Sequence, residues 1–283
     1  MSDQPIQPFS HQPDPWVSLR AFTPARIALG RTGVAIPLQE VLQFRMAHAH
    51  ARDAVYSLLA TTTLAARLTG LGYAVQDLHS RAADRHEYLQ RPDKGRRLNE
   101  ASVQILRNAG APPTTISRTD QAVGNTESST NKQPPVSPLL SIVLADGLSA
   151  TAVNHHAIPL LEILLPQLQA GGFSVAPINL VQQGRVAIGD EIGMLQEASM
   201  VIVLIGERPG LSSPDSLGIY LTYRPVLGLT DEARNCISNI RPGGLSYQAA
   251  ADKLYWFIRE STRLQISGVG LKDEEGLLDA STR

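Results

Sequence analysis

The sequence predicts an α/β protein, with a doubly wound, mostly parallel, Rossmann-like sheet that follows a mainly helical N-terminal region. In the second half of the chain, short apolar runs rich in Leu, Ile and Val alternate with helical patterns. That order is typical of a parallel sheet covered on both faces. In the first half, apolar residues instead recur at helical spacing.

Composition divides the chain into four parts. Residues 1–18 are polar and rich in proline, which predicts a disordered or arm-like tail. Residues 19–116 carry the helical patterns of the N-terminal region. Residues 117–138 are rich in Ser, Thr, Asn, Gln and Pro and are expected to be a polar flexible linker. Residues 139–283 form the predicted α/β domain.

Proline and cap residues locate the N-terminal helices. Thr23 and Pro24 predict one helix start, as an N-cap followed by proline at the first helical position, and Pro37 opens a second helix. Further helices are expected over 61–71 and from about 99 to 110.

In the α/β domain, strands and helices alternate. Strands are expected over residues 139–146, 173–181, 199–205 and 217–225. Helices are expected over 149–169 and 188–198 and after Ser246, which is the predicted cap of a long terminal helix. The stretch DEARNCISNIRPGGL, residues 231–245, reads as a helical turn followed by a loop.

Composition also excludes several functional classes. The 283 residues carry a formal net charge of −1, so nothing predicts binding to nucleic acid or to an anionic membrane. The single cysteine excludes an internal disulfide framework and a cysteine-rich zinc site. The sequence shows neither a signal peptide nor a run of about twenty apolar residues. We therefore expect a soluble, cytoplasmic protein.

A ligand is expected beyond the carboxyl ends of the strands, where open α/β sheets bind their ligands. Three predicted strands end there in Asp146-Gly147, in the loop 183–186 and in the loop 206–208. Glu207 lies on this rim, where its carboxylate could accept hydrogen bonds from the amides or hydroxyls of a ligand. It could equally pair with Arg208 or cap a turn, and the residues alone leave both interpretations open.

Other motifs are weak or missing. The sequence has no GxGxxG after a strand, no GxxxxGK[ST] and no GxSxG. The pairs His48/His50 and His155/His156 have poor spacing for metal ligands on a helix. Cys236 is either a small hydrophobic residue or a residue that lines a ligand. The residues thus indicate a binding crevice without catalytic groups of its own.

Several stretches together resemble a known family. They are LRAFTPARIALGRTG, FRMAHAHARDAV, RPDKGRRL, ADGLSATAVNHHAIPLL, QGRVAIGDEIG, VIVLIGERPGLSSPDSLGIYLTY and RNCISNIRPGGLSYQAAADKL. Over residues 19–273 the chain resembles the small (light) subunit of ethanolamine ammonia-lyase. The long tail and the polar linker are less typical of that family.

The resemblance implies an adenosylcobalamin-dependent lyase that converts ethanolamine to acetaldehyde and ammonia by radical chemistry, and that is active only as a complex with a large subunit. In this family the large subunit, a TIM barrel, binds ethanolamine and the small subunit covers the cobalamin from the other side. The cofactor then carries the hard chemistry. A location inside a bacterial microcompartment is also implied by the family.

The family's cobalamin contacts fall on Val186, Glu207 and Cys236, and the resemblance implies no catalytic residue and no metal ligand in this chain. Cobalamin has amides at the corrin edge, which require acceptors such as Glu207, and a nucleotide tail that requires an apolar slot. Asp146 is followed by Gly147 and Leu148, so the DxHxxG motif is missing and the resemblance implies that dimethylbenzimidazole stays on cobalt.

Two other classes of function are open from the residues. One is a stand-alone α/β binding or regulatory module with another ligand. The other is an autonomous hydrolase that uses Asp146, Glu207 or Cys236.

Overall fold

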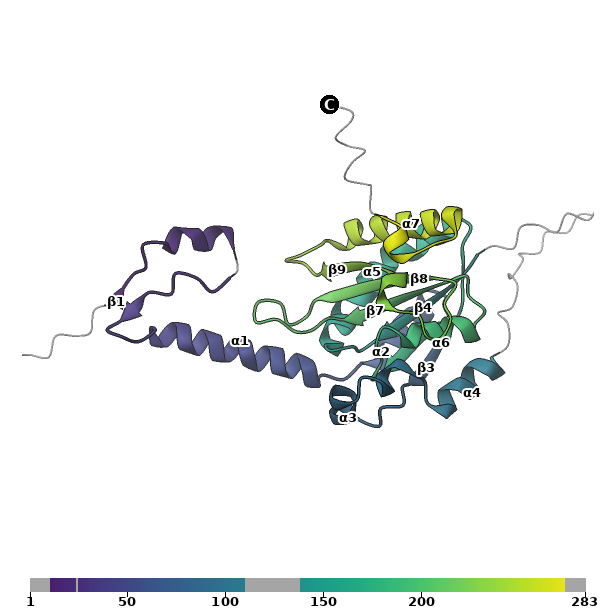
Figure 1. Ribbon diagram of the computed structural model, residues 1–283, viewed down its shortest axis with the longest axis horizontal. Helices are drawn as coiled ribbons and strands as arrows, with labels where there is room; N and C mark the ends of the chain where they lie inside the picture. Colours follow the sequence, from purple (N-terminus) through teal and green to yellow (C-terminus); the bar gives the residue numbers. More distant parts are fainter. Residues whose placement is uncertain (1–10, 24, 110–137, 273–283) are drawn as a thin grey trace, which may run out of the picture.

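A seven-stranded sheet forms the centre of the protein, as seen in a computed structural model that describes residues 11–23, 25–109 and 138–272 (Figure 1). Its strand order is β3-β6-β4-β7-β8-β9, and the short β5 pairs with β4. The strands are β3 (Val75–His79), β4 (Leu139–Ala145), β5 (Ser174–Val175), β6 (Ile178–Gln182), β7 (Met200–Gly206), β8 (Leu217–Tyr223) and β9 (Arg234–Ile240).

The sheet is mixed. Strands β3, β6, β4, β5 and β7 pair in parallel, whereas β8 is antiparallel to β7 and β9 is antiparallel to β8. Only residues 207–216 connect β7 to β8, which is too short for the crossover that a parallel neighbour needs. The predicted α/β class with a mostly parallel sheet is confirmed, but the narrower Rossmann-like, doubly wound assignment is not.

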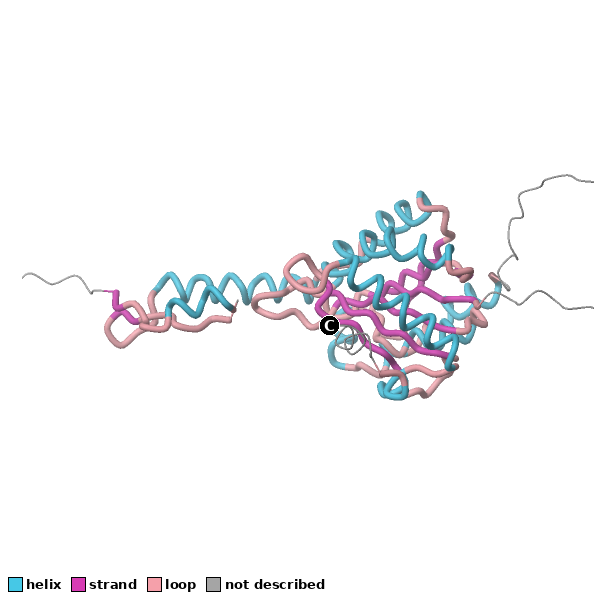
Figure 2. The backbone as a smooth tube through the Cα atoms, turned by 90° about the horizontal axis from the view of Figure 1, so that it is seen from above, coloured by secondary structure: helices cyan, strands magenta, loops and turns pink. Residues whose placement is uncertain are grey.

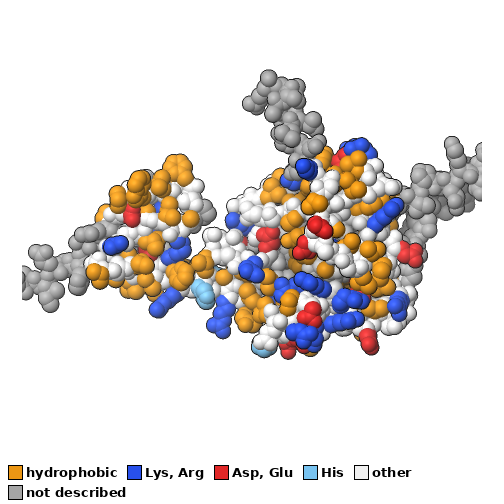
Figure 3. Space-filling model, viewed as in Figure 1, with side chains coloured by type: hydrophobic (Ala, Val, Ile, Leu, Met, Phe, Trp, Pro, Cys, Tyr) orange, Lys and Arg blue, Asp and Glu red, His pale blue; other side chains and the backbone are white. Residues whose placement is uncertain are grey.

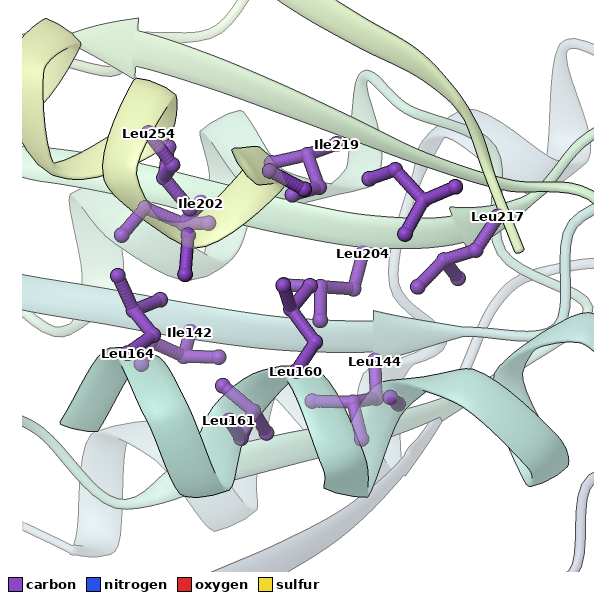
Figure 4. Packing of buried hydrophobic residues seen from close by; sticks show 14 of the residues in the cluster. Ile142, Leu144, Leu160, Leu161, Leu164, Ile202, Leu204, Leu217, Ile219 and Leu254 are labelled. Atoms are coloured by element: carbon purple, nitrogen blue, oxygen red, sulfur yellow. The ribbon is translucent and has the colours of Figure 1, made fainter. Parts of the chain in front are cut away.

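Helices pack on both faces of this sheet. On one face, α2 (Thr61–Gly70), α5 (Ala150–Ala170) and α7 (Tyr247–Leu264) contribute to one apolar cluster with the strands. Figure 4 shows leucines of α5 meeting strand residues such as Ile142 and Leu144. On the other face, α4 (Glu100–Asn108) and α6 (Ile188–Leu195) pack against Val143 and Ala145. Alternate strand residues thus face two separate cores.

Side-chain caps begin three of these helices, and one of them, Ser246, was the predicted cap. The side chain of Ser149 accepts a hydrogen bond from the Ala152 backbone N–H, Ser246 does the same for Ala249, and Asn99 does so for Ser102. These bonds satisfy backbone donors that have no partner inside the helix. The predicted helices over 61–71, from about 99, over 149–169 and after Ser246 are confirmed.

Other expectations for the main body were wrong. Residues 231–245 hold a short 3-10 turn, Asp231–Ala233, followed by strand β9 instead of a loop. The expected strand over 173–181 is divided into β5 and β6. The N-terminal region contributes an unexpected strand, β3, and an unexpected short helix, α3 (Arg85–Gln90).

The N-terminal segment 11–56 extends from this body as an arm (Figures 1 and 2). It contains β1 (His11–Gln12), a 3-10 helix Val17–Phe22, β2 (Arg31–Thr32) and the helix α1 (Leu38–Tyr56), which begins at the predicted Pro37. The helix expected after Thr23 is not formed by residues 25–30, where Ala28 and Gly30 have positive φ. Residues 1–10 of the expected tail and 117–137 of the expected linker lie outside the described residues.

Many apolar side chains are exposed on the arm, where Figure 3 shows them among charged and other polar groups. Ala54 is the buried residue of α1, and it lies near the end that joins the body. Polar contacts such as the 2.8 Å ion pair between Arg20 and Glu40 hold the arm segments together. The exposed apolar residues include Trp16, Phe22, Leu38, Leu42, Phe44 and Met46.

Among the described residues, no helix is both long enough and apolar enough to cross a membrane.

Candidate cofactor site

Loops at the carboxyl ends of β4, β6 and β7 surround a hollow of about 460 Å³. This is the edge at which the sequence predicted a ligand, and the volume falls within the range of ligand pockets. Its walls are formed by Tyr88, Gly147, Leu148, Arg185, Val186, Ile205, Gly206, Glu207, Arg208 and Tyr220.

A larger hollow of about 520 Å³ lies between the start of α6, residues 227–231 and the side chains of Asp93, Arg96 and Arg97. Several of its charged wall residues already have partners: Asp190 is paired with Arg234 through two hydrogen bonds of 2.6 and 2.8 Å, and Arg97 is paired with Glu191. The side chains of Asp190 and Arg234 are only 2% exposed. We therefore interpret the larger hollow as part of the structural packing around α6, and the hollow at the carboxyl ends of β4, β6 and β7 as the ligand site.

Two glycines bring the loops of β4 and β7 into contact. Gly147 has a φ of +57°, and a Cβ there would lie 2.3 Å from the Gly206 carbonyl oxygen. A Cβ on Gly206 would lie 1.9 Å from the Ser149 carbonyl oxygen. The Leu148 N–H donates to the Gly206 carbonyl over 2.9 Å. Only glycine permits this approach of two backbones.

Asp146 joins the loops of β4 and β6. Its carboxylate accepts the backbone N–H groups of Gln183 (2.8 Å) and Gly184 (2.9 Å), and its side chain is buried. Burial raises the pKa of this carboxyl, while the two backbone donors and Arg85, at 3.8 Å, act in the opposite direction. Both oxygens of Asp146 are thus used to fix the shape of the rim.

Glu207 lies at the rim as expected. One carboxylate oxygen, Oε2, accepts the hydroxyl of Ser216 and the backbone N–H of Asn239, the latter over 3.4 Å. The carboxylate passes over Gly218, where a Cβ would lie 3.0 Å from Oε1. Within the described residues no hydrogen bond reaches Oε1, and Arg208 is not the partner of Glu207. The alternative in which these two side chains pair is therefore wrong.

Cys236 and Val186 both lie near the ring of Tyr220. Cys236 lies directly opposite Tyr220 in the pairing of β9 with β8. Shielding by protein raises the pKa of the thiol, and the charge of Glu207 adds to the effect. Val186 and Tyr220 pack against the same apolar cluster. Val186 and Glu207 thus line the hollow, whereas Cys236 does not line it and is only the cross-strand neighbour of the wall residue Tyr220. Cys236 is an exposed strand residue and not a buried loop residue.

Tyr88 is a site residue that the sequence analysis missed. It comes from α3, its side chain is fully buried, and its hydroxyl donates to the Gly184 carbonyl over 3.1 Å. Burial raises its pKa. The guanidinium groups of Arg85 and Arg185 lie over its ring. The i, i+3 spacing of Arg85 and Tyr88 was the available signal, but it required recognition of α3.

His155 and His156 come close to Asp215, which the spacing argument did not consider. One ligand atom from each lies within 4.8 Å of the others. However, His156 is already bonded through Nδ1 to Tyr247 (2.8 Å) and through Nε2 to Asp215 (3.3 Å). Its nitrogens therefore have protein partners.

Comparison with known proteins identifies the family. A family model described as ethanolamine ammonia-lyase light chain matches residues 13–272. The chain belongs to the ethanolamine ammonia-lyase light chain family.

Curated relatives of this light chain come from several pseudomonads, and each is named ethanolamine ammonia-lyase small subunit. A Pseudomonas fluorescens relative is 51% identical over 274 residues, covering 97% of this chain and 91% of its own length. One from Pseudomonas putida is 53% identical over 262 residues, covering 92% and 88%. One from Pseudomonas aeruginosa is 52% identical over 269 residues, covering 93% and 91%. The resemblance noted in the sequence is thus confirmed at the level of the family.

Proposed function

We propose that this light chain holds part of adenosylcobalamin for an ethanolamine ammonia-lyase, which converts ethanolamine to acetaldehyde and ammonia as a complex with a large subunit. The observation that carries the proposal is the grouping of Val186, Glu207 and Tyr220, the cross-strand neighbour of Cys236, around one hollow at the carboxyl edge of the sheet. Adenosylcobalamin supplies, when bound, the radical that starts the reaction.

The residues of the hollow suit this cofactor. Oε1 of Glu207 has lone pairs available for an amide N–H of the corrin edge. Val186, Ile205 and Tyr220 offer apolar wall to the nucleotide tail. Cobalamin is much larger than a hollow of 460 Å³, so this chain would cover only part of it. A second protein surface is needed to complete the enclosure and exclude water.

The position of the arm is consistent with a large subunit that binds at the carboxyl edge of the sheet, next to the hollow. The Arg85 side chain connects the two, because its Nε donates to the Val55 carbonyl of α1 over 2.6 Å and its Nη1 donates to the Gly147 carbonyl over 2.8 Å. The arm thus leaves the body next to the hollow. Its exposed apolar residues form a surface of the kind that is covered in a complex. We propose that the large subunit covers both the hollow and the arm.

An autonomous hydrolase is less well supported. Asp146 uses both carboxylate oxygens for backbone N–H groups, so it is poorly placed to act as a base. The raised pKa of the Cys236 thiol opposes formation of the thiolate nucleophile. A stand-alone binding module stays distinguishable by experiment, because it would bind its ligand without a partner.

The deciding experiment is co-purification of this chain with its large subunit, followed by measurement of cobalamin affinity and acetaldehyde formation. Glu207→Gln should weaken cobalamin binding by about 10- to 100-fold, as expected for loss of a hydrogen bond to a charged group. The matched control is Glu162→Gln, which alters an exposed glutamate on α5. Unchanged cobalamin affinity in the Glu207 variant would contradict its assigned role, and turnover by the isolated chain would contradict the shared site.

We also propose a cytoplasmic location, within a microcompartment in bacteria that build one for ethanolamine. Cell fractionation, with the large subunit followed in the same fractions, tests this placement.

A further inference from the structure

Two positively charged groups stack on one buried aromatic ring beneath the hollow. The Cζ atoms of Arg85 and Arg185 lie 4.6 Å and 4.2 Å from the ring centroid of Tyr88. The ring is held in place by its own hydroxyl, which donates to the Gly184 carbonyl. Cation–π attraction stabilises such contacts, most strongly where water is excluded. The stack therefore fixes the position of Arg185, which also forms part of the wall of the hollow.

Arg185 is held in place by its hydrogen bonds and by close packing against Gly95. The Arg185 N–H donates to the Gly95 carbonyl over 2.8 Å, and its Nη2 donates to the Tyr88 carbonyl over 3.2 Å. A Cβ on Gly95 would lie 2.8 Å from Cγ of Arg185. A long, flexible side chain has thus been immobilised before any ligand binds, which lowers the entropic cost of binding.

The two arginines that stack on Tyr88 differ in their ion-pair partners. Arg85 has the buried carboxylate of Asp146 at 3.8 Å, whereas Arg185 has no ion-pair partner among the described residues. The Nε of Arg185 is buried without a hydrogen-bond partner, and its Nη1 is bonded to no described residue. A guanidinium keeps its charge at any physiological pH, so burying it with unmatched donors is costly until an acceptor binds.

The hollow therefore combines a fixed cation at Arg185 with an available carboxylate oxygen at Glu207. A ligand that fits both has an anionic oxygen group and separate amide donors. Arginine binds phosphate with particular geometric selectivity because its N–H groups form a planar fork.

We infer that Arg185, positioned by Tyr88, binds the phosphodiester of the cofactor's nucleotide tail, while Glu207 binds the amides of the corrin edge; this inference rests on the proposed function. It assigns the two ends of the cofactor to two different walls of the hollow. Tyr88 is a positioning residue in this arrangement, since it acts through the guanidinium of Arg185.

The test uses the complex of both subunits and three probes without turnover: cyanocobalamin, cobinamide phosphate and cobinamide. The last lacks the phosphate. Arg185→Gln should lower the affinity for cyanocobalamin and cobinamide phosphate by about 10- to 100-fold, and that for cobinamide by less than about twofold. Selective loss would support the assignment, because cobinamide binding shows that the variant is folded and assembled.

Arg208→Gln is the matched control, since it removes a second arginine from the wall of the same hollow. An equal loss for all three probes in Arg185→Gln would show a structural role and overturn the inference. Phosphate-selective loss in Arg208→Gln, with Arg185→Gln unaffected, would also overturn it. A wild-type complex that binds none of the probes would contradict the proposed function itself.

Tyr88 variants separate positioning from folding. Tyr88→Phe keeps the ring and loses the hydroxyl bond to Gly184, so it should retain wild-type discrimination between cobinamide phosphate and cobinamide. Tyr88→Leu removes the stack and should lose most of that discrimination. If Tyr88→Leu keeps it, the stack does not position Arg185.

Discussion

Replacing Asp190 with Ala removes the buried carboxylate partner of Arg234 and leaves only the exposed carboxylate of Asp231, 3.5 Å from Nε of Arg234. The side chains of Asp190 and Arg234 are 2% exposed and form a bidentate pair between α6 and β9. Arg234 also donates to the Thr222 hydroxyl over 3.0 Å and to the Leu229 carbonyl over 3.2 Å, so it cannot leave its site without breaking other bonds. Removing one member of a buried pair costs about 3–5 kcal/mol. We expect Asp190→Ala to lower the free energy of unfolding by about that amount.

Urea denaturation followed by tryptophan fluorescence measures this loss, because Trp256 lies on α7, against the main apolar cluster. Asp252→Ala is a suitable control, since Asp252 is an exposed carboxylate that accepts the side-chain amides of Gln167 and Gln248. The double variant Asp190→Leu/Arg234→Met should be more stable than Asp190→Ala, because it leaves no buried unpaired charge; the carboxylate of Asp231, which loses its partner, is exposed to water. A loss below about 1 kcal/mol for Asp190→Ala, or a double variant that is less stable still, would refute this account of the pair.

Three further outcomes follow from the site and its surroundings. Gly206→Ala should destabilise the fold by at least about 2 kcal/mol, measured by urea denaturation, because its Cβ meets the Ser149 carbonyl; a neutral effect would mean that the loops do not meet as described. Burial lowers the pKa of His156 below 6.5 despite the opposing effect of Asp215. The unfolded chain therefore takes up this proton first, and stability should fall as pH drops below about 6.5; His156→Gln should flatten that part of the unfolding profile, and an unchanged slope would contradict the assignment. Cys236 should react with iodoacetamide more slowly at pH 7.5 than a free thiol, because its raised pKa leaves less thiolate; mass spectrometry would show whether it is instead hyper-reactive.

Most of the main fold could be predicted from the sequence, and the errors have a common physical cause. Strands β4 and β7 are continuous apolar runs because helices cover both of their faces. Strand β9 reads RNCISNI and resembles a loop. Its first two polar residues are buried because distant residues supply partners: Asp190 for Arg234, and the Gly268 and Leu271 carbonyls for Asn235. The local sequence pattern of β9 gives no information about these distant partners, so the strand could not be predicted from it.

The candidate site was predictable to a similar degree. Glu207 follows a buried strand, so its place on the rim could be inferred from the general topology of α/β sheets. Val186 lies in the loop 183–186 that the fold argument marked, and Cys236 was one of two open interpretations, but the resemblance singled both out as cobalamin contacts. The position of Cys236 opposite Tyr220 depends on the pairing of β8 with β9. Tyr88 comes from a six-residue helix, which is too short for a clear periodic signal. Long-range pairing, not local propensity, creates this part of the site.

The rigid connection between arm and body has a consequence for assembly. α1 contains 19 residues, so at 1.5 Å per residue it separates its two ends by about 28 Å. A partner that binds both the arm and the rim is therefore engaged bivalently through a stiff spacer. Once one contact forms, the second is held at a high effective concentration only if the partner's two surfaces match that separation. The length of α1 would thus set the distance between the two contacts. A longer or shorter helix would lower the avidity even if every contacting side chain were kept.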